Sequence, residues 1–243
     1  MDNIDFLTVQ NEVIEKVFEL ENIKRREYLA QFKYISLFHD YIIEQATLQY
    51  ENRIMLEAIK SKADNVEFNV VEKKKELEDK IKGFEANNNL GKQVLEVYDK
   101  YSLEDINSLD ELYKEFISKY HPAINVKSSN EQVQLYQALT SVYLIGEVNE
   151  FKSMYETAIV NLKELVIEND EDKIIKTYEL TLENIKPLIN KRKESLPFIF
   201  EDLVNDESKI TSEISKFRES IYQLKEMNKN LRMDYEVNFN ESF

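Results

Sequence analysis

The sequence predicts an all-α protein, and three observations support that prediction. Glycine and proline number only three each among 243 residues, so the chain has few of the residues that turns between strands require. Charged residues make up 33% of the chain, which is typical of long helices with one solvated face. Apolar residues recur at steps of three and four, which is the spacing of a single helical face.

Two long helices joined by a short polar turn are expected at the N-terminus. Residues 8 to about 60 contain no glycine or proline, and the charged run Lys24–Glu27 interrupts their apolar stripe. The turn signal Ser61–Asn65, SKADN, follows, and a second apolar stripe comes after it. These features favour an antiparallel helical hairpin over residues 1–90. The segment Gly83–Gly91, GFEANNNLG, is the best candidate for its boundary.

Residues 91–165 are expected to form a core of shorter helices. The patterns Ser108–Glu111 and Ser128–Glu131 predict two capping boxes, in which each side chain satisfies a backbone N–H of the first helical turn. The two helices behind them carry matched apolar faces, so we expect them to pack as an antiparallel pair. Gly146 is expected to end the second of these helices in a left-handed cap.

Residues 166–243 are expected to form a C-terminal antiparallel hairpin or coiled coil. The turn Asn169–Asp172, NDED, precedes a helix at about 171–194, and another helix starts at about Asp206. Steps of four and three along this last helix mark a coiled-coil seam at Ile210, Ile214, Phe217, Ile221, Leu224, Asn228 and Leu231. The expected partner of the seam is the helix at 171–194, and a homodimer is the alternative. Asn228 would set the register at some cost in stability, unless this end is frayed and exposed.

The composition argues against several classes of function. A net charge of −15 disfavours binding to nucleic acid or to an anionic membrane surface. The absence of cysteine excludes disulfides and thiolate metal sites, and two widely spaced histidines make a histidine metal site unexpected. The acidic, amphipathic N-terminus does not read as a signal peptide, and no apolar run approaches the roughly 18 residues of a membrane span. We therefore expect a soluble, cytoplasmic protein.

Catalysis is not expected either. The sequence contains no glycine-rich phosphate loop, no G-x-S-x-G elbow and no H-E-x-x-H helix. Acidic pairs occur throughout, as in any helix of this composition, so they do not single out a catalytic dyad. No enzyme activity, cofactor or metal is therefore predicted.

The run Leu112–Pro122, LYKEFISKYHP, resembles the second helix and following loop of a J domain, the DnaJ module. In that family a Tyr-His-Pro-Asp run ends the second helix, and the segment Leu139–Tyr143 stands where the third helix would close. The order of helix, loop and helix matches over about residues 92–148. The whole chain resembles a group of bacterial J-domain-like proteins with an N-terminal hairpin and a C-terminal coiled coil. In that group a Leu-Pro or Phe-Pro step introduces the coiled coil, as in Glu194–Leu203, ESLPFIFEDL.

The resemblance implies contact with a DnaK-type chaperone, whose ATP hydrolysis the family's His-Pro-Asp triplet stimulates. His121 and Pro122 match that triplet, but Ala123 stands in place of the aspartate. Alanine can neither accept a hydrogen bond nor pair with an arginine, and the loss of one member of a buried charge pair typically costs ~2–5 kcal/mol. The second helix of a J domain also exposes a basic stripe, whereas Lys114 and Lys119 here stand among carboxylates. Both departures weaken the expected stimulation.

We therefore expect a non-catalytic protein–protein interaction protein, an adaptor or scaffold with coiled-coil arms on a degenerate J-like core. One alternative is a divergent J-domain co-chaperone of a DnaK-type ATPase, and another is a homo-oligomeric structural coiled coil. The dense apolar link LPFIFEDL should be buried or form a contact surface. The residues expected to contact a partner are His121, Pro122, Ala123, Lys114, Lys119, Phe198 and Phe200.

Overall fold

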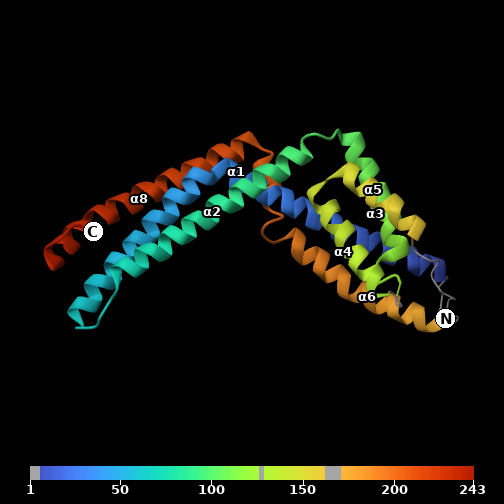
Figure 1. The fold of residues 1–243 in the computed structure, drawn as a ribbon, viewed down its shortest axis with the longest axis horizontal. Helices are drawn as coiled ribbons and strands as arrows, with labels where there is room; N and C mark the ends of the chain where they lie inside the picture. The colour runs from blue at the N-terminus through green and yellow to red at the C-terminus, as the bar shows by residue number, and fades with distance from the viewer. Residues whose placement is uncertain (1–5, 126–128, 162–170) are drawn as a thin grey trace. The chain divides into compact units, whose positions relative to one another are not determined.

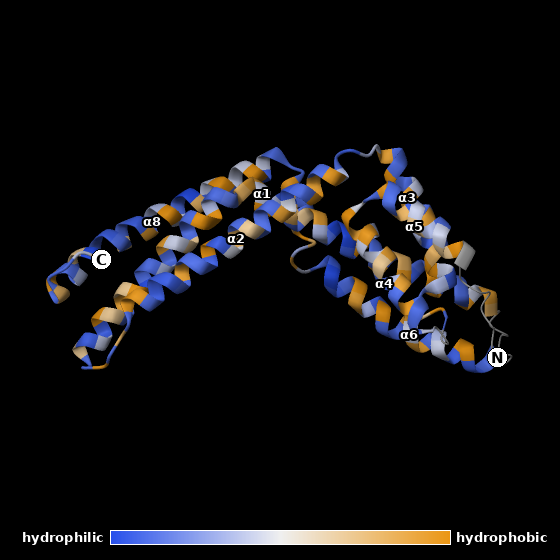
Figure 2. Ribbon diagram, in the orientation of Figure 1, coloured by the Kyte–Doolittle hydropathy of each residue, from blue (hydrophilic) through white to orange (hydrophobic). Residues whose placement is uncertain are grey.

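The computed structural model describes residues 6–125, 129–161 and 171–243 (Figure 1). Within these ranges all regular structure is helical, which confirms the all-α class. The helices are α1 (Phe6–Ala63), α2 (Val70–Tyr98), α3 (Leu103–Tyr120), α4 (Asn130–Ile145), α5 (Val148–Asn161), α6 (Glu171–Lys193), α7 (Phe200–Val204) and α8 (Glu207–Phe239). Hydrophilic and hydrophobic residues are interspersed along each helix, as expected for helices with one packed face (Figure 2).

The chain forms two compact units, and each is built from two separate stretches. Unit 1 comprises Met1–Gln31 and Val94–Glu201, and unit 2 comprises Phe32–Gln93 and Asp202–Phe243. Helices α1 and α2 therefore contribute to both units. The sequence led us to expect three consecutive domains, 1–90, 91–165 and 166–243. Each unit of the structure instead combines two stretches that are distant in the sequence.

The α3–α4 pair forms the centre of unit 1. The rings of Tyr113 and Tyr143 stack with centroids 3.7 Å apart, and those of Phe116 and Tyr136 lie 6.1 Å apart at 10°. As the residue number rises on α3 it falls on α4, so the expected antiparallel pairing is confirmed. Phe151 of α5 presents its edge to Tyr113 at 5.8 Å. Apolar residues from the start of α1, including Val13, complete this core.

Helix α6 runs parallel to the first half of α1 in unit 1. Side-chain contacts between the two helices include Gln10 with Tyr178, Glu19 with Lys193 and Glu27 with Arg192. The contacting residues are separated along the chain by 165 to 174 positions throughout. A separation that stays nearly constant means that both helices advance in the same direction. Ile189 anchors this side of α6 in an apolar cluster with Leu20 and Ile23.

In unit 2 the seam of α8 is covered by the second half of α1. Two apolar layers form this contact, and they contain Phe38 with Phe217 and Ile221, and Met55 and Ala58 with Leu231 and Tyr235. From Tyr34–Glu213 to Lys62–Asn238 the separation along the chain stays between 172 and 181 residues. Helix α8 is therefore also parallel to α1.

The expected partner of this seam was wrong. The heptad itself is confirmed, since Phe217, Ile221, Asn228 and Leu231 are all buried. However, the helix at 171–194, which is α6, belongs to unit 1, and the seam faces α1 instead. A heptad pattern shows which face is packed but carries no information on which other apolar stripe will cover it.

The helix break expected at Gly83–Gly91 was wrong, because α2 continues through this segment from Val70 to Tyr98, although the division between the two units lies close by, after Gln93. Tertiary packing outweighs the low helix propensity of the asparagines and glycines. Asn88 is buried, and Gly91 lies so close to α1 that a Cβ atom on it would stand 2.6 Å from Cδ1 of Phe32. Glycine is therefore used here for close helix approach rather than for a turn.

Both predicted capping boxes differ from those in the structure. Helix α3 is capped by Ser102 with Asp105, so the predicted box at Ser108 was wrong and lies inside the helix. Aspartate at the third helical position accepts the N–H of the cap as glutamate would. Helix α4 is capped by Ser129 with Gln132, one residue after the predicted box, and Ser128 lies outside the described residues. Of the predicted NDED turn, Asn169 and Asp170 also lie outside them, and α6 starts at Glu171.

The left-handed cap at Gly146 is confirmed, with φ of 74°. Its N–H donates to the carbonyl groups of Tyr143 and Val142.

The two glycines of α2 provide a matched test of its packing. Gly83→Ala should raise the free energy of unfolding by about 1 kcal/mol, because alanine favours a helix and a Cβ there meets nothing within 4 Å. Gly91→Ala should lower it, because the added methyl group collides with the buried Phe32 ring. Urea titration followed by circular dichroism measures both changes. Equal effects of the two substitutions would contradict the close approach of α2 to α1.

Candidate functional site

The His-Pro-Ala turn closes α3 through backbone hydrogen bonds around His121. The N–H of His121 donates to the carbonyl of Ile117 at 3.0 Å. Its own carbonyl accepts the N–H groups of Ile124 at 2.9 Å and Asn125 at 2.8 Å. These bonds replace the helical ladder that Pro122 cannot continue, because proline has no N–H.

The imidazole of His121 is engaged inside this turn. Its Nδ1 accepts the backbone N–H of Ala123 at 3.0 Å, and its ring meets that of Tyr136 edge-on at 4.8 Å. Burial, with the charge of Lys24 as a smaller cause, lowers the pKa of His121 to about 4. His121 is therefore neutral at pH 7 and shapes the turn. Pro122 is exposed, whereas Ala123 is partly buried against the core of unit 1.

The two lysines predicted to contact a partner are paired within the chain. Lys119 lies 2.5 Å from Glu115, one turn earlier on α3. Lys114 pairs with Glu15 of α1 and lies 5.9 Å from the centre of the Phe18 ring. Both ammonium groups keep partial exposure, so solvent weakens these pairs. The pairing nevertheless reduces the positive charge that α3 presents.

A buried polar cluster beneath the α3–α4 pair was not predicted from the sequence. We define it by Arg25, Asn22, Asp110 and Tyr143. Nη2 of Arg25 lies 2.9 and 3.0 Å from the two carboxylate oxygens of Asp110. The hydroxyl of Tyr143 donates to Asp110 at 3.0 Å, and Asn22 donates to Asp110 and to the Tyr143 oxygen at 3.3 Å.

The buried polar cluster joins α1 to both helices of the pair. The guanidinium of Arg25 lies over the Tyr143 ring at 4.7 Å, and this arginine is only 4% exposed. Within the described part of the chain, Nε and Nη1 of Arg25 have no hydrogen-bond partner. The carboxylate of Asp110 therefore offsets most of the free-energy cost of burying the positive charge of Arg25.

The same stretch of α1 supplies a second charged contact beside His121. Nζ of Lys24 lies 2.7 Å from the carboxylate of the buried Glu21. Burial, followed by the nearby charge of Glu21, raises the pKa of Tyr136 to about 12. The charged run that breaks the apolar stripe of α1 is thus partly buried against α3 and α4. The only signal for this in the sequence was the break itself.

The apolar link before α8 is divided between anchoring and exposed side chains. Phe198 packs on the cluster of Leu20, Ile23 and Ile189, and the guanidinium of Arg26 lies 5.0 Å from its ring centre. Phe200 is partly buried at the start of α7. Ile199 and Leu196 are the exposed members, at 49% and 62%. The predicted contact residues therefore fall in three places, which are the His-Pro-Ala turn, the lysines of α3 and this link.

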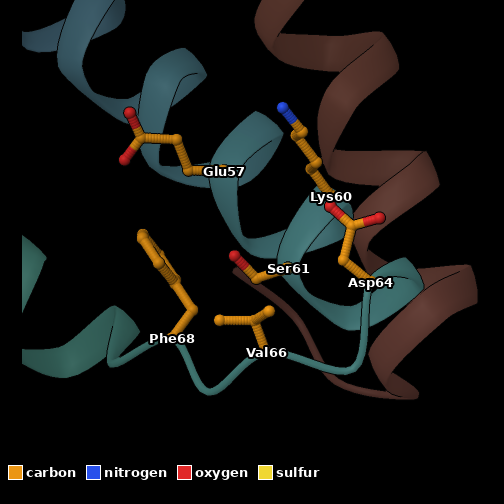
Figure 3. Close-up of a pocket in the computed structure, with 6 residues that line it drawn as sticks. All are labelled: Glu57, Lys60, Ser61, Asp64, Val66 and Phe68. Carbon is orange, nitrogen blue, oxygen red and sulfur yellow. The ribbon is translucent and has the colours of Figure 1, made fainter.

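An open hollow of about 350 Å³ lies at the turn between α1 and α2 in unit 2 (Figure 3). Its lining residues are Glu57, Lys60, Ser61, Asp64, Val66 and Phe68. Two carboxylates, those of Glu57 and Asp64, and the single ammonium group of Lys60 stand beside the apolar Val66 and Phe68, so the charges of the lining do not point to one class of ligand.

No family model, curated protein or solved structure matches the chain. Within the described ranges, no helix is long and apolar enough to cross a membrane. Across the same residues, no group of three or more histidine, aspartate and glutamate side chains is arranged to hold a metal ion.

Neighbouring arginines of α1 provide a test of the buried polar cluster. Arg25→Met should reduce the free energy of unfolding by about 3 kcal/mol, because it leaves Asp110 beneath α1 without its cation. Arg26→Met is the matched control and should cost about 1 kcal/mol or less, since the Arg26–Glu201 pair is partly exposed to solvent. Chemical denaturation measures both. A smaller loss for Arg25→Met than for Arg26→Met would contradict the assigned role.

The shifted pKa of His121 predicts how stability depends on pH. The folded value of about 4 lies below the ordinary value of 6.5, so the unfolded chain binds more protons between these two pH values. The contribution of His121 is complete above pH 6.5 and is lost as the pH falls towards 4, by up to about 3 kcal/mol. His121→Gln should reduce this pH dependence, measured by thermal denaturation across the range. His39→Gln, which leaves the turn intact, is the control and should retain it.

Proposed function

We propose that the protein is a non-catalytic adaptor or scaffold that acts in the cytoplasm through protein–protein contacts. In this proposal α3 and α4 are a degenerate J-like pair, retained as architecture, and the helices of unit 2 are a coiled-coil arm. The observation that carries the proposal is the state of the His-Pro-Ala turn. His121 is neutral and bonded to Ala123, so its imidazole stabilises the turn and offers no charge to a partner.

The surroundings of the turn support the same proposal. The cations on α3 are neutralised by Glu15 and Glu115, and Ala123 provides no acidic group. A chaperone whose arginine needs a carboxylate on the turn, and whose carboxylates need free lysines on α3, would find few such groups here. The exposed Leu196 and Ile199 instead provide apolar contact area next to an anchored phenylalanine, which is the pattern of a small interaction surface.

One observation favours the runner-up, a divergent co-chaperone of a DnaK-type ATPase. Pro122 is exposed just after the end of α3, so a partner could reach the proline of the His-Pro pair. The homo-oligomeric alternative is less favoured, because the seam of α8 is already covered by α1 of the same chain.

An ATPase assay with a DnaK-type chaperone, run beside an affinity capture from the source cells, tests the proposal. The purified protein should leave ATP hydrolysis unchanged. A captured partner should be lost with the Leu196→Ser, Ile199→Ser variant and kept with His121→Gln. Clear stimulation of ATP hydrolysis that disappears with His121→Gln would overturn the adaptor proposal in favour of the co-chaperone.

A further inference from the structure

A polar layer interrupts the apolar seam between α1 and α8. Asn52 and Asn228 face each other across it and are only 3% and 7% exposed. Their layer lies between the apolar layer that contains Phe38 and Phe217 and the one that contains Met55 and Leu231. Burial of two amides in such a position is unfavourable unless their hydrogen bonds are made.

The hydrogen bonds of both amides are made in this arrangement. Asn228 donates to Oδ1 of Asn52 at 2.8 Å and to Glu51 at 3.0 Å, and its own Oδ1 accepts Nε of Arg232 at 2.6 Å. Asn52 donates to the carbonyl of Leu224 at 3.1 Å. Arg232 also donates to Glu51 at 2.8 Å, which closes the network.

We propose that this polar layer fixes the register of α8 along α1. The remaining seam positions of α8 are apolar and repeat every seven residues, so they fit α1 nearly as well after a shift of one heptad. Such a shift moves α8 by about 10 Å and separates Asn52 from Asn228. Each amide then loses its buried partner, which disfavours the shifted pairing by about tenfold or more. The polar layer therefore lowers the stability of the seam but favours a single register of α8 along α1.

Spin-label distances between α1 and α8 report the alignment directly. The chain contains no cysteine, so Asp40→Cys and Lys229→Cys would be the only two labelling sites. Both positions are exposed, Asp40 on α1 and Lys229 on α8, and both lie in unit 2. Because Lys229 is adjacent to the polar layer and Asp40 lies more than three turns before it, a heptad shift changes their distance by about 10 Å.

Two variants in this labelled background test the proposal. Asn52→Leu with Asn228→Leu removes the layer, and a second distance should then appear about 10 Å from the first. The midpoint of thermal unfolding should rise, because two buried polar groups are replaced by apolar ones. Asn52→Ile with Ile59→Asn exchanges two residues without changing composition. It should shift the main distance to a longer value, because Asn228 then pairs one heptad further along α1.

The matched control is Leu224→Ile with Leu231→Ile, which changes the seam but keeps the layer and should give the single native distance. If both test variants remain helical and also retain only the native distance, the link before α8 and the apolar seam set the register, and the proposal is overturned. The exchange variant decides the matter alone if the double leucine variant does not fold.

Discussion

The apolar face of α1 has to be covered by helices that lie far from it in the sequence, and the rest of the structure depends on this constraint. In unit 1 the first half of α1 packs against α6 and the α3–α4 pair, and in unit 2 its second half packs against α8. Both C-terminal helices run parallel to α1. Parallel neighbours cannot be joined by a tight turn, which is why the intervening helices are needed to return the chain to the start of α1.

The His-Pro-Ala turn shows how a short motif can be kept for structural reasons. Pro122 ends the helix, His121 caps it, and Ala123 supplies the N–H that the imidazole accepts. Each residue of the turn therefore has a local role that requires no partner. The lysines of α3 are likewise engaged by carboxylates of the same chain. In the proposed function this turn is a structural joint, and contacts with other proteins are made elsewhere.

Periodic features were predictable from the sequence, and features that depend on distant contacts were not. The hairpin turn after α1, the faces of α3 and α4, the cap at Gly146 and the heptad of α8 all follow local patterns. The partner of α8, the role of Gly91 and the Arg25–Asp110 pair each depend on residues far away in the chain. Charged residues at Lys24–Glu27 looked like a defect in an apolar stripe. Three of them have partners far away in the chain, because Arg25 pairs with Asp110, Arg26 with Glu201 and Glu27 with Arg192. No local pattern connects these partners to the run.

The parallel arrangement also has a consequence for synthesis and folding. Residues that contact each other across α1 and its C-terminal neighbours are separated by 165 to 181 positions. During translation the parts of α1 that pack on α6 and α8 therefore stay open to water until those helices have left the ribosome. Contacts of such long range form slowly, and open apolar surface promotes aggregation meanwhile. The nascent chain therefore exposes, for most of its synthesis, apolar surface that the folded protein buries.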